Sequence, residues 1–271
     1  MVVFPEAKIN IGLHVTGKRS DGYHTIESVF YPIPLCDILE IVFSEADSGF
    51  ALQVTGTKLP GNPSDNLCSK AYRLFSEIHP LPGAKAALHK IIPAGAGLGG
   101  GSSDGSHTLR LLNELAGEPL NTETLLQLAS ELGSDCPFFI RNKPAFVTGR
   151  GEILEPISID LQGNYLLLIH PRIHVPTAEA YKLVSPSAPV FSLTELPQLP
   201  LREWRDKVKN DFEAGIFRVH PEIQGIKEKL YAMGAIYASM SGSGSSVYGI
   251  FPDEPELPSD FGKYFVWKGR L

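Results

Sequence analysis

Segment 93–103 limits the possible structures of this chain more strongly than any other part of the sequence. It reads Pro-Ala-Gly-Ala-Gly-Leu-Gly-Gly-Gly-Ser-Ser, and five of the seven positions from Gly95 to Gly101 are glycine. A backbone with so few side chains can turn several N–H groups toward one anion and let phosphate oxygens approach closely. The segment therefore predicts a phosphate-binding loop. Its candidate residues are Pro93, Ala94, Gly95, Ala96, Gly97, Leu98, Gly99, Gly100, Gly101, Ser102 and Ser103.

The sequence on either side of this loop predicts a strand before it and a helix after it. Residues 86–92 read as a strand, and Leu109 and Leu112 begin an apolar pattern at helical spacing. Ser102 or Ser103 is the expected N-cap of that helix. The loop would then lie at a helix N-terminus, where unpaired N–H groups and the helix dipole favour negative charge. A flexible linker is the alternative, and the two flanking elements disfavour it.

Three motifs of other nucleotide-binding proteins fit the sequence less well. The P-loop ends in Gly-Lys-Ser/Thr, and no lysine follows these glycines. Gly95, Gly97 and Gly100 match G-x-G-x-x-G, but a dinucleotide fold would place an acidic residue at the end of the next strand. The acids that follow lie in or between predicted helices instead. The triplet 260–262, Asp-Phe-Gly, resembles a protein-kinase motif, but no His-Arg-Asp run precedes it, so we interpret it as a coincidence.

Composition and charge exclude several classes of protein. The 271 residues suffice for one large domain or two of ordinary size. The formal net charge of −6 argues against a general nucleic-acid-binding surface. The longest aliphatic stretch, 166–169, is too short to span a bilayer. Because residues 1–15 lack a basic segment followed by an apolar run, we expect no signal peptide. We therefore expect a cytoplasmic protein with no nucleic-acid or membrane partner. We also expect a monomer or weak homodimer.

The cysteines and histidines do not predict a metal site. Cys36, Cys68 and Cys136 are scattered and show no paired spacing, which is typical of reduced thiols. The histidines have no spacing that suits metal ligands, so no metal-binding residue is assigned.

The hydrophobic pattern predicts a mixed α+β protein with two lobes. Apolar residues at every second position of 9–15 predict a half-buried strand, whose polar set, including Lys8 and Asn10, lies on one face. Further strands are expected at 38–43, 51–54, 145–148, 165–170, 235–239 and 247–251. We place the boundary between an N-terminal domain, 1–158, and a C-terminal domain, 159–271.

Capping residues predict where the other helices begin and end. Ser64 or Asp65 is the expected N-cap of one helix, and Asn121 is the expected N-cap of another. Gly133 is expected to end the second of these as a C′ residue. Residues 185–200 are rich in proline and serine and are expected to form an irregular surface connection.

Three segments together resemble the motifs of the GHMP kinases, which include galactokinase, homoserine kinase and mevalonate kinase. Segment 7–15 is similar to their first motif, Pro93 with the glycines and serines that follow to their second, and 240–245 to their third. The resemblance spans nearly the whole chain. It implies an ATP-dependent small-molecule kinase with a two-lobed α+β fold and an active site in the cleft between the lobes.

Further segments are similar to one branch of this family, whose substrate is a cytidine diphosphate-linked methylerythritol of the non-mevalonate isoprenoid route. They are 21–24, Asp-Gly-Tyr-His, and 133–139, Gly-Ser-Asp-Cys-Pro-Phe-Phe, together with the late loop. The resemblance implies phosphorylation of the 2-hydroxyl of that small molecule, with segment 21–24 around the cytosine. The candidate substrate-binding residues are Asn10, Tyr23, His24, Phe30, Tyr181, Gly242, Ser243 and Gly244.

Transfer of a phosphoryl group to an alcohol needs an acceptor for the hydroxyl proton and groups that stabilise charge. Asp135 lies just past a predicted helix end among apolar residues, where a partly desolvated carboxylate suits a general base. On the residues alone, Asp135 as an N-cap and Lys8 as a solvated lysine also remain open. The resemblance assigns Asp135 as the base and Lys8 as its electrostatic partner. It implies ATP and Mg²⁺ as cofactors, with the hydroxyls of Ser102 and Ser103 near phosphate or magnesium.

Three alternatives stay open from the sequence. Another GHMP kinase, of the homoserine or mevalonate type, would have no base to hold at segment 21–24, and on the residues alone Tyr23 and His24 are also compatible with an ordinary turn. A non-catalytic nucleotide-binding protein would not need both Lys8 and Asp135. A dinucleotide oxidoreductase is the most distant alternative.

Asp104, directly after the serines, is expected to alter helix capping and to leave the phosphate loop unchanged.

Overall fold

The computed structural model describes residues 1–44, 49–58 and 65–271. The chain divides into two compact units that interleave along the sequence. The first unit comprises Met1–Ala7, Leu35–Ala94 and Gly99–Lys143, and the second comprises Lys8–Pro34, Gly95–Leu98 and Pro144–Leu271. The domain boundary at residues 158 and 159 stays a prediction, because units defined by contacts do not follow one another along the chain.

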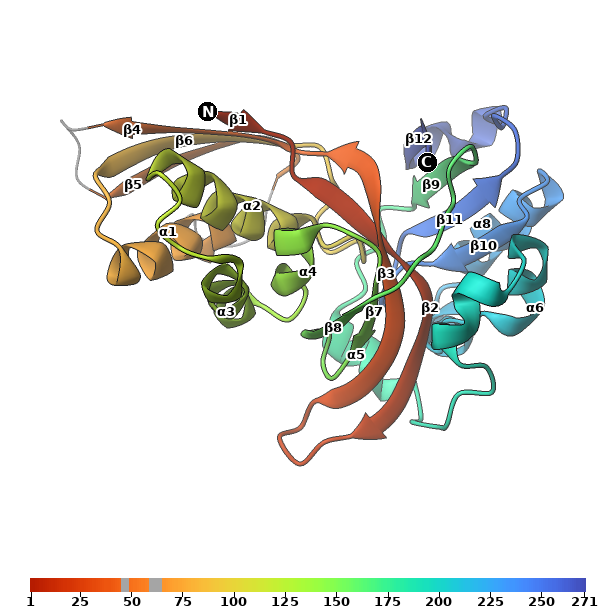
Figure 1. Ribbon diagram of the computed structural model, residues 1–271. Helices are drawn as coiled ribbons and strands as arrows, with labels where there is room; N and C mark the ends of the chain where they lie inside the picture. Colours follow the sequence, from red (N-terminus) through yellow and green to blue (C-terminus); the bar gives the residue numbers. More distant parts are fainter. Residues whose placement is uncertain (45–48, 59–64) are drawn as a thin grey trace. The chain divides into compact units, whose positions relative to one another are not determined.

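The first unit is one sheet with helices on one face (Figure 1). The strand order is β1 (Val2–Val3), β4 (Ile38–Ser44), β6 (Gly83–Lys90), β5 (Phe50–Gly56), and only the β5–β6 pair is parallel within this described sheet. The helices are α1 (Leu67–Ile78), α2 (Gly100–Leu115), α3 (Thr122–Leu132) and α4 (Cys136–Arg141). Their apolar sides form a core with the sheet around Phe75, Leu88 and Leu112. Burial of these apolar side chains is the main force that holds the helices on the sheet.

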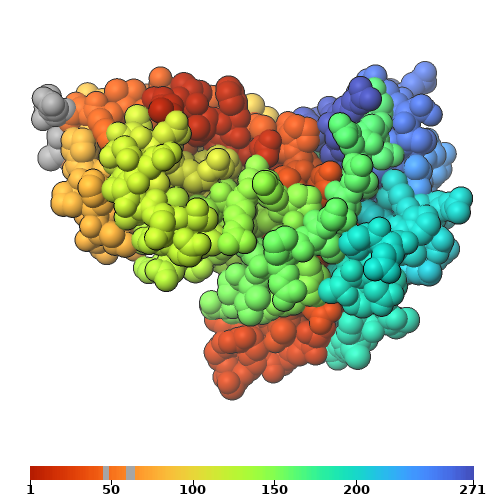
Figure 2. All heavy atoms as spheres, viewed as in Figure 1, coloured from red at the N-terminus to blue at the C-terminus, as the bar shows by residue number. Residues whose placement is uncertain are grey.

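The second unit contains two further four-stranded sheets. One has the order β10 (Tyr237–Met240), β11 (Val247–Phe251), β9 (Tyr165–His170), β12 (Phe265–Arg270), with every neighbour antiparallel. The other has the order β2 (Glu6–Lys18), β3 (His24–Cys36), β7 (Ala145–Thr148), β8 (Ile153–Pro156). The connection between β2 and β3 lies at the molecular surface, seen in red-orange in Figure 2.

Short helices complete the second unit. Helix α8 (Pro221–Ala232) packs on β10 and β11, and α7 (Phe212–Val219) contacts α5 (Thr177–Lys182). The remaining helical segments are α6 (Trp204–Lys207) and the 3-10 turns Leu193–Gln198, Leu201–Glu203 and Ser259–Lys263. The core of the unit gathers around Leu167, Phe212 and Leu230.

Most of the predicted elements are confirmed. The strand before the phosphate loop is β6, the helix after it is α2, and strands 145–148 and 165–170 are found with the expected bounds. The α+β class is confirmed as well. These elements were predictable because each has a strong local signal, either a period-two or a helical apolar pattern bounded by glycine, proline or a cap.

Strand β2 differs from its prediction because both of its faces are buried. The apolar set is covered as expected, but Lys8, Asn10 and His14 on the polar face are only 3%, 2% and 5% exposed. A buried polar group is tolerated when it has hydrogen-bond partners. The side chains of Asn10 and His14 both have such partners inside the second unit.

The predicted helix caps were partly wrong. Helix α2 begins earlier than expected, at Gly100, and its N-cap is Gly99 in the left-handed conformation (φ 69°) rather than a serine. Asn66 caps α1 instead of Asp65, and Ser64 lies outside the described residues. Gly133 does end α3, which Asn121 caps as predicted, but its φ of 170° is extended and not that of a left-handed C′ glycine.

Residues 185–200 are not wholly irregular. They include the 3-10 turn Leu193–Gln198, whose Leu193 and Leu196 are fully buried. A Cβ at Gly12 (φ 68°) would lie 2.6 Å from Leu193 Cδ2, so glycine is required in β2 for this close approach. The prediction failed because two leucines among many prolines give no periodic signal.

Candidate active site

The glycine-rich loop 93–103, which the sequence predicts to bind phosphate, ends at a helix start that has no side-chain cap. Helix α2 follows Gly99 without a capping hydrogen bond, and Ser103 N donates to Gly99 O at 2.8 Å to close the first turn. The N–H groups of a first helical turn lack partners within the helix and attract anions. A Cβ at Gly101 would meet nothing within 4 Å, so open space lies beside this turn.

The two serines of the loop differ in their surroundings. Ser103 is fully buried and its Oγ lies 3.3 Å from His107 Nδ1. Burial lowers the pKa of His107 to about 4, so this imidazole is neutral at pH 7. Ser102 is half-buried. Of the two hydroxyls, that of Ser102 is therefore the one positioned to reach a ligand.

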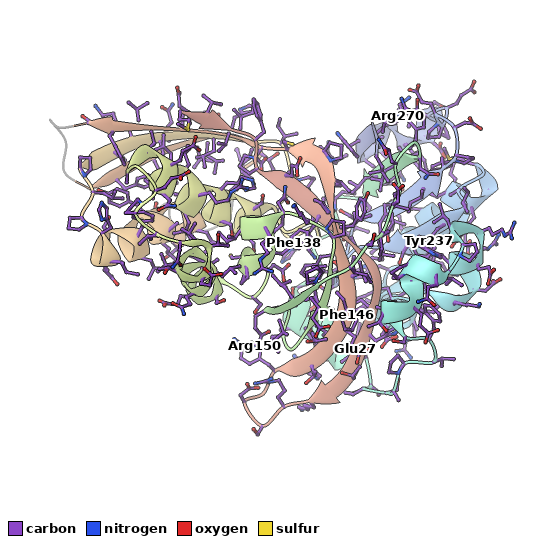
Figure 3. The ribbon with its side chains drawn as sticks, viewed as in Figure 1. Glu27, Phe138, Phe146, Arg150, Tyr237 and Arg270 are labelled. Carbon is purple, nitrogen blue, oxygen red and sulfur yellow. The ribbon has the colours of Figure 1, made fainter. Side chains whose placement is uncertain are left out.

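Asp135 lies between α3 and α4 and occupies the N-cap position of α4, as one of the two sequence interpretations expected. The residue is half-buried, and its side chain makes no capping hydrogen bond to α4. Ser106 Oγ of α2 donates to Cys136 O at 2.7 Å, which ties the Asp135 segment to the phosphate-loop helix within the first unit. Phe138, labelled in Figure 3, packs edge-on against Phe139 with ring centroids 5.0 Å apart. The segment that carries Asp135 is thus anchored by apolar packing in α4 and by a hydrogen bond from α2.

The thiol beside Asp135 is not reactive. Burial raises the pKa of Cys136 to about 12, and the negative charge of Asp135 adds to this rise. A thiol with this pKa stays protonated at neutral pH, so Asp135 is the group of this pair that can accept a proton.

Lys8 lies in β2 of the second unit, where its ammonium is held by neighbouring side chains. Its Nζ donates to Asn10 Oδ1 at 2.6 Å and lies 4.3 Å from the centroid of the Phe30 ring. Asn10 Nδ2 donates in turn to Ser28 Oγ at 2.8 Å. This arrangement fixes the orientation of the Asn10 amide and holds Lys8 by a charge-assisted hydrogen bond and a cation–π contact.

The second glycine loop of the sequence lies directly against the middle of the first. Ser241 Oγ donates to Gly97 O at 2.8 Å, and Ser246 N donates to Ala96 O. Gly97 has φ 78°, and a Cβ there would lie 2.0 Å from Ser241 O. Gly242, also with positive φ (57°), approaches the same backbone. Residues 95–98 of the first glycine loop and the second glycine loop, far apart in sequence, therefore pack against each other inside the second unit.

Asn210 supports this second loop and was missed in the sequence. Its Nδ2 donates to Met240 O at 2.8 Å and to Gly242 O at 2.9 Å, while its Oδ1 accepts from Phe212 N. Asn210 is 3% exposed. The sequence held one signal for this role, because Asn210 and Asp211 lie between the apolar residues Val208 and Phe212. A polar residue in an apolar setting is usually hydrogen-bonded.

The four aromatic residues that were predicted to bind the substrate lie in different surroundings. His24 and Tyr181 stack with ring centroids 4.6 Å apart and 13° between planes. Tyr23 is 56% exposed, and the guanidinium of Arg150, labelled in Figure 3, lies 5.0 Å from its ring centroid. Phe30 is buried, and its ring lies beneath the ammonium of Lys8. Of the four, His24 and Tyr181 therefore form a stacked pair, whereas Tyr23 and Phe30 each lie against a cation.

Asp104 was expected to alter helix capping, but its side chain does not cap α2. It is 2% exposed, and its Oδ2 accepts a hydrogen bond of 2.6 Å from Lys90 Nζ. Lys90 also contacts Asp37, which precedes β4. Lys90 could have been recognised from the alternation in β6, because it shares the buried face with Ala86 and Leu88.

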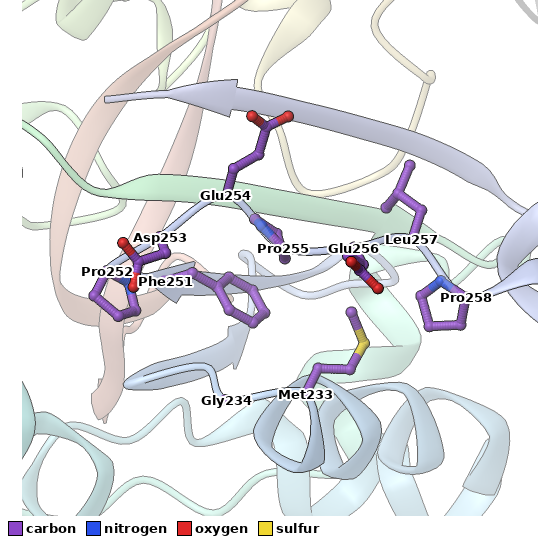
Figure 4. Close-up of a pocket in the computed structure, with 10 residues that line it drawn as sticks. All are labelled: Met233, Gly234, Phe251, Pro252, Asp253, Glu254, Pro255, Glu256, Leu257 and Pro258. Carbon is purple, nitrogen blue, oxygen red and sulfur yellow. The ribbon is translucent and has the colours of Figure 1, made fainter.

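A pocket elsewhere in the second unit contains none of these residues. It has a volume of about 600 Å³ and is shown in Figure 4. Its lining is Met233, Gly234, Phe251, Pro252, Asp253, Glu254, Pro255, Glu256, Leu257 and Pro258. Glu254 is paired with Lys268. The pocket combines apolar and acidic lining residues, and we assign no chemistry to it.

All three cysteines lie in the described part of the chain and are unpaired thiols. Among the helices of residues 1–44, 49–58 and 65–271, none combines the length and the hydrophobicity that a bilayer crossing requires.

The predicted site residues therefore fall into two groups. The first unit holds Asp135 with the first turn of α2. The second unit holds Lys8 and Asn10 with residues 95–98 of the first glycine loop and with the second glycine loop. Two family models of known proteins match segments of this chain. The family model of the GHMP kinases N terminal domain matches residues 66–143. The family model of the GHMP kinases C terminal domain matches residues 193–260.

Relatives of known name are similar over almost their whole length. The 4-diphosphocytidyl-2-C-methyl-D-erythritol kinase of Bacteroides thetaiotaomicron is 50% identical, with 100% of each chain covered. The kinase of the same name from Azobacteroides pseudotrichonymphae is 52% identical, with 93% of each chain covered. A crystal structure of 4-(cytidine 5'-diphospho)-2C-methyl-D-erythritol kinase superposes with a TM-score of 0.82 at 30% identity, covering 99% of this chain and 98% of that one. The chain belongs to the GHMP kinase family and is an ATP-dependent small-molecule kinase.

Proposed function

We propose that this kinase transfers the γ-phosphoryl group of ATP to the 2-hydroxyl of 4-diphosphocytidyl-2-C-methyl-D-erythritol, giving the 2-phosphate and ADP. The observation that carries the proposal is the similarity to kinases of that name across the full length of both chains. The stacked His24–Tyr181 pair supports a substrate with a cytosine base, because an aromatic face stacks on a planar ring. A homoserine or mevalonate substrate would give that pair no base to hold.

The residues around the phosphate loop suit the triphosphate. Glycine backbone and the start of α2 offer N–H donors, and the space beside Gly101 is not filled by a side chain. ATP supplies the phosphoryl group, and Mg²⁺ neutralises charge on its phosphates when bound. The half-buried hydroxyl of Ser102 is the residue we assign to phosphate or magnesium.

Asp135 and Lys8 take the roles that the family resemblance implied. Asp135 accepts the proton of the 2-hydroxyl, and its position at the start of α4 keeps it on a segment anchored by apolar packing. Lys8, oriented by Asn10, stabilises negative charge that develops on the transferred group. We further propose a cytoplasmic enzyme, a monomer or weak homodimer, that acts without nucleic-acid or membrane partners.

An assay with three alcohols tests this substrate. Purified protein with ATP and Mg²⁺ is expected to release ADP with 4-diphosphocytidyl-2-C-methyl-D-erythritol and not with mevalonate or homoserine. A coupled assay for ADP measures the release. Turnover with another alcohol would retain the kinase and reject the cytidine substrate. Absence of turnover with all three, from protein shown to bind ATP, would favour a non-catalytic nucleotide-binding protein.

A charge placed at Gly101 tests the phosphate loop. Because a side chain fits there without a clash, Gly101→Asp and Gly101→Asn are expected to fold equally well. The added carboxylate repels triphosphate at the helix start, so Gly101→Asp is expected to bind ATP roughly ten- to a hundredfold more weakly than Gly101→Asn. Isothermal titration with ATP measures the difference. Equal affinities of the two variants would show that phosphate binds elsewhere.

A further inference from the structure

A buried ion cluster lies at the base of the phosphate loop in the first unit. Lys90 is the last residue of β6, Asp37 precedes β4, and Asp104 lies in α2. Lys90 Nζ donates to Asp104 Oδ2 at 2.6 Å and also contacts Asp37 Oδ2. The three side chains are at most 2% exposed. One ammonium therefore joins two carboxylates out of contact with solvent.

The second oxygen of Asp37 holds the residues that enter the loop. Asp37 Oδ1 accepts hydrogen bonds from Ile91 N at 2.5 Å and from Ile92 N at 2.9 Å. These two residues come directly before Pro93. Asp104 lies directly after Ser103, at the other end of the loop. The cluster thus contacts the chain immediately before and immediately after segment 93–103.

The packing between these two ends is close. A Cβ at Gly100 would lie 2.8 Å from Ile92 Cγ2 and 3.3 Å from Lys90 Nζ. The start of α2 therefore packs against Ile92, just after β6, and against the lysine itself. A small shift of Lys90 would move the first turn of α2 and its N–H groups.

We propose that Lys90, bridging Asp37 and Asp104, is a positioning device that fixes both ends of the phosphate loop and thereby sets the geometry of its phosphate-binding N–H groups. The inference rests on the proposed role of this loop in binding ATP. Buried ion pairs contribute little net stability compared with apolar residues of similar volume, so stability alone does not explain three ionisable groups here. A fixed backbone geometry does, because preorganised donors lower the cost of binding.

The charge state of the cluster suits this role. Burial raises the pKa of Asp104 to about 8; Lys90 opposes the rise and Asp37 adds to it. The two carboxylates raise the pKa of Lys90 although its burial lowers it. The thiol of Cys68 in α1 stays neutral because burial raises its pKa. The raised pKa of Asp104 therefore favours its neutral form beside the ammonium of Lys90.

Substitutions of Asp104 test the inference. Asp104→Asn keeps an oxygen acceptor for Lys90 and is neutral, as the protonated carboxyl group is. Asp104→Leu has a similar volume but no acceptor. We expect Asp104→Leu to raise the KM for ATP about tenfold, with a smaller change in kcat and an unchanged KM for the alcohol, whereas Asp104→Asn stays within about twofold of the native KM. Steady-state kinetics with each substrate varied in turn measures the effect.

A core variant of the same unit is the control for lost stability. Ile41 of β4 is fully buried in the core of the first unit and pairs with Ala86, away from the Lys90 end of β6, so Ile41→Ala leaves a cavity without touching the cluster. We expect Ile41→Ala to lower Tm while retaining the native KM for ATP. If Ile41→Ala raises this KM as much as Asp104→Leu, or if Asp104→Leu retains the native KM, the positioning role is wrong. Asp104→Ala replaces Asp104→Leu in the same comparison if the leucine variant does not fold.

The pH dependence of stability gives an independent readout. The pKa of Asp104 in the folded protein lies above its ordinary value of 3.8, so the folded state binds this proton more tightly than the unfolded state. The contribution of Asp104 to stability is therefore fully present below about pH 4 and is lost as the pH rises through about 8. We expect Asp104→Asn to remove this decline from the native curve of Tm against pH. Identical curves for the two proteins would overturn the assigned charge state.

Failure of this inference can be told apart from failure of the proposed function. If native protein does not bind ATP, or if Gly101→Asp binds it as Gly101→Asn does, the phosphate loop itself is misassigned. If those variants differ as expected and Asp104→Leu binds ATP like the native protein, only the positioning role of Lys90 is wrong.

Discussion

Replacing Asp135 by asparagine is expected to lower kcat by about a thousandfold, within the range of roughly a hundred to ten-thousandfold that general bases contribute. The amide has nearly the same shape but cannot accept the proton of the 2-hydroxyl. The KM values for ATP and for the alcohol should change little, because the proton is transferred only as the reaction proceeds. Steady-state and single-turnover kinetics measure both effects.

The folded state of Asp135→Asn should be close to native. Asparagine is as good an N-cap residue as aspartate, and the Asp135 side chain makes no capping hydrogen bond to α4. Thermal unfolding and ATP binding serve as controls and should both match the native protein. Near-native turnover by this folded variant would refute Asp135 as the base.

Replacing Gly97 by alanine is expected to lower kcat/KM about a hundredfold, because misplacement of binding groups by about 1 Å can have that effect. The new Cβ would lie 2.0 Å from Ser241 O, and a backbone oxygen cannot move aside like a flexible side chain. The hydrogen bond from Ser241 Oγ to Gly97 O would be displaced as the two glycine loops separate. Kinetics with saturating and limiting ATP measure the loss.

The matched control is Gly163→Ala. Gly163 has a similar positive φ, 89° against 78° at Gly97, but a Cβ there meets nothing within 4 Å. Both variants carry the backbone strain of alanine in the left-handed region, and only Gly97→Ala carries the clash. Gly163→Ala should lower Tm without loss of activity. Equal loss of activity in the two variants would mean that the contact between the glycine loops has no part in catalysis.

Local patterns predicted the elements that carry the site but not the contacts between them. The glycine loop, the strand before it and the helix after it were all predicted, and Asp135 was placed correctly just past α3. The capping serines were wrong because glycine at Gly99 can adopt a left-handed conformation that ends the loop earlier. A residue type shows which caps are possible, whereas the φ and ψ angles of the loop decide which one is used.

Long-range contacts explain the residues that the sequence could not assign. Asn210 reaches Met240 and Gly242, which are 30 and 32 positions away in the sequence. Lys90 reaches Asp37 across 53 positions. Periodicity reports on one element at a time, so it cannot show that a polar side chain finds a partner on another element. The same limit explains why β2 was expected to have one solvated face.

By itself, the sequence determined that this chain has a glycine-rich loop between a strand and a helix, an α+β fold, and the motifs of a GHMP kinase. These features depend on backbone freedom and on hydrophobic spacing, which single segments carry. Only the tertiary structure decided that Lys8 is held by Asn10, that Gly97 lies against Ser241, and that Lys90 joins Asp37 to Asp104. Burial made those contacts necessary, because a polar group removed from water must find its partner wherever the fold brings one within reach.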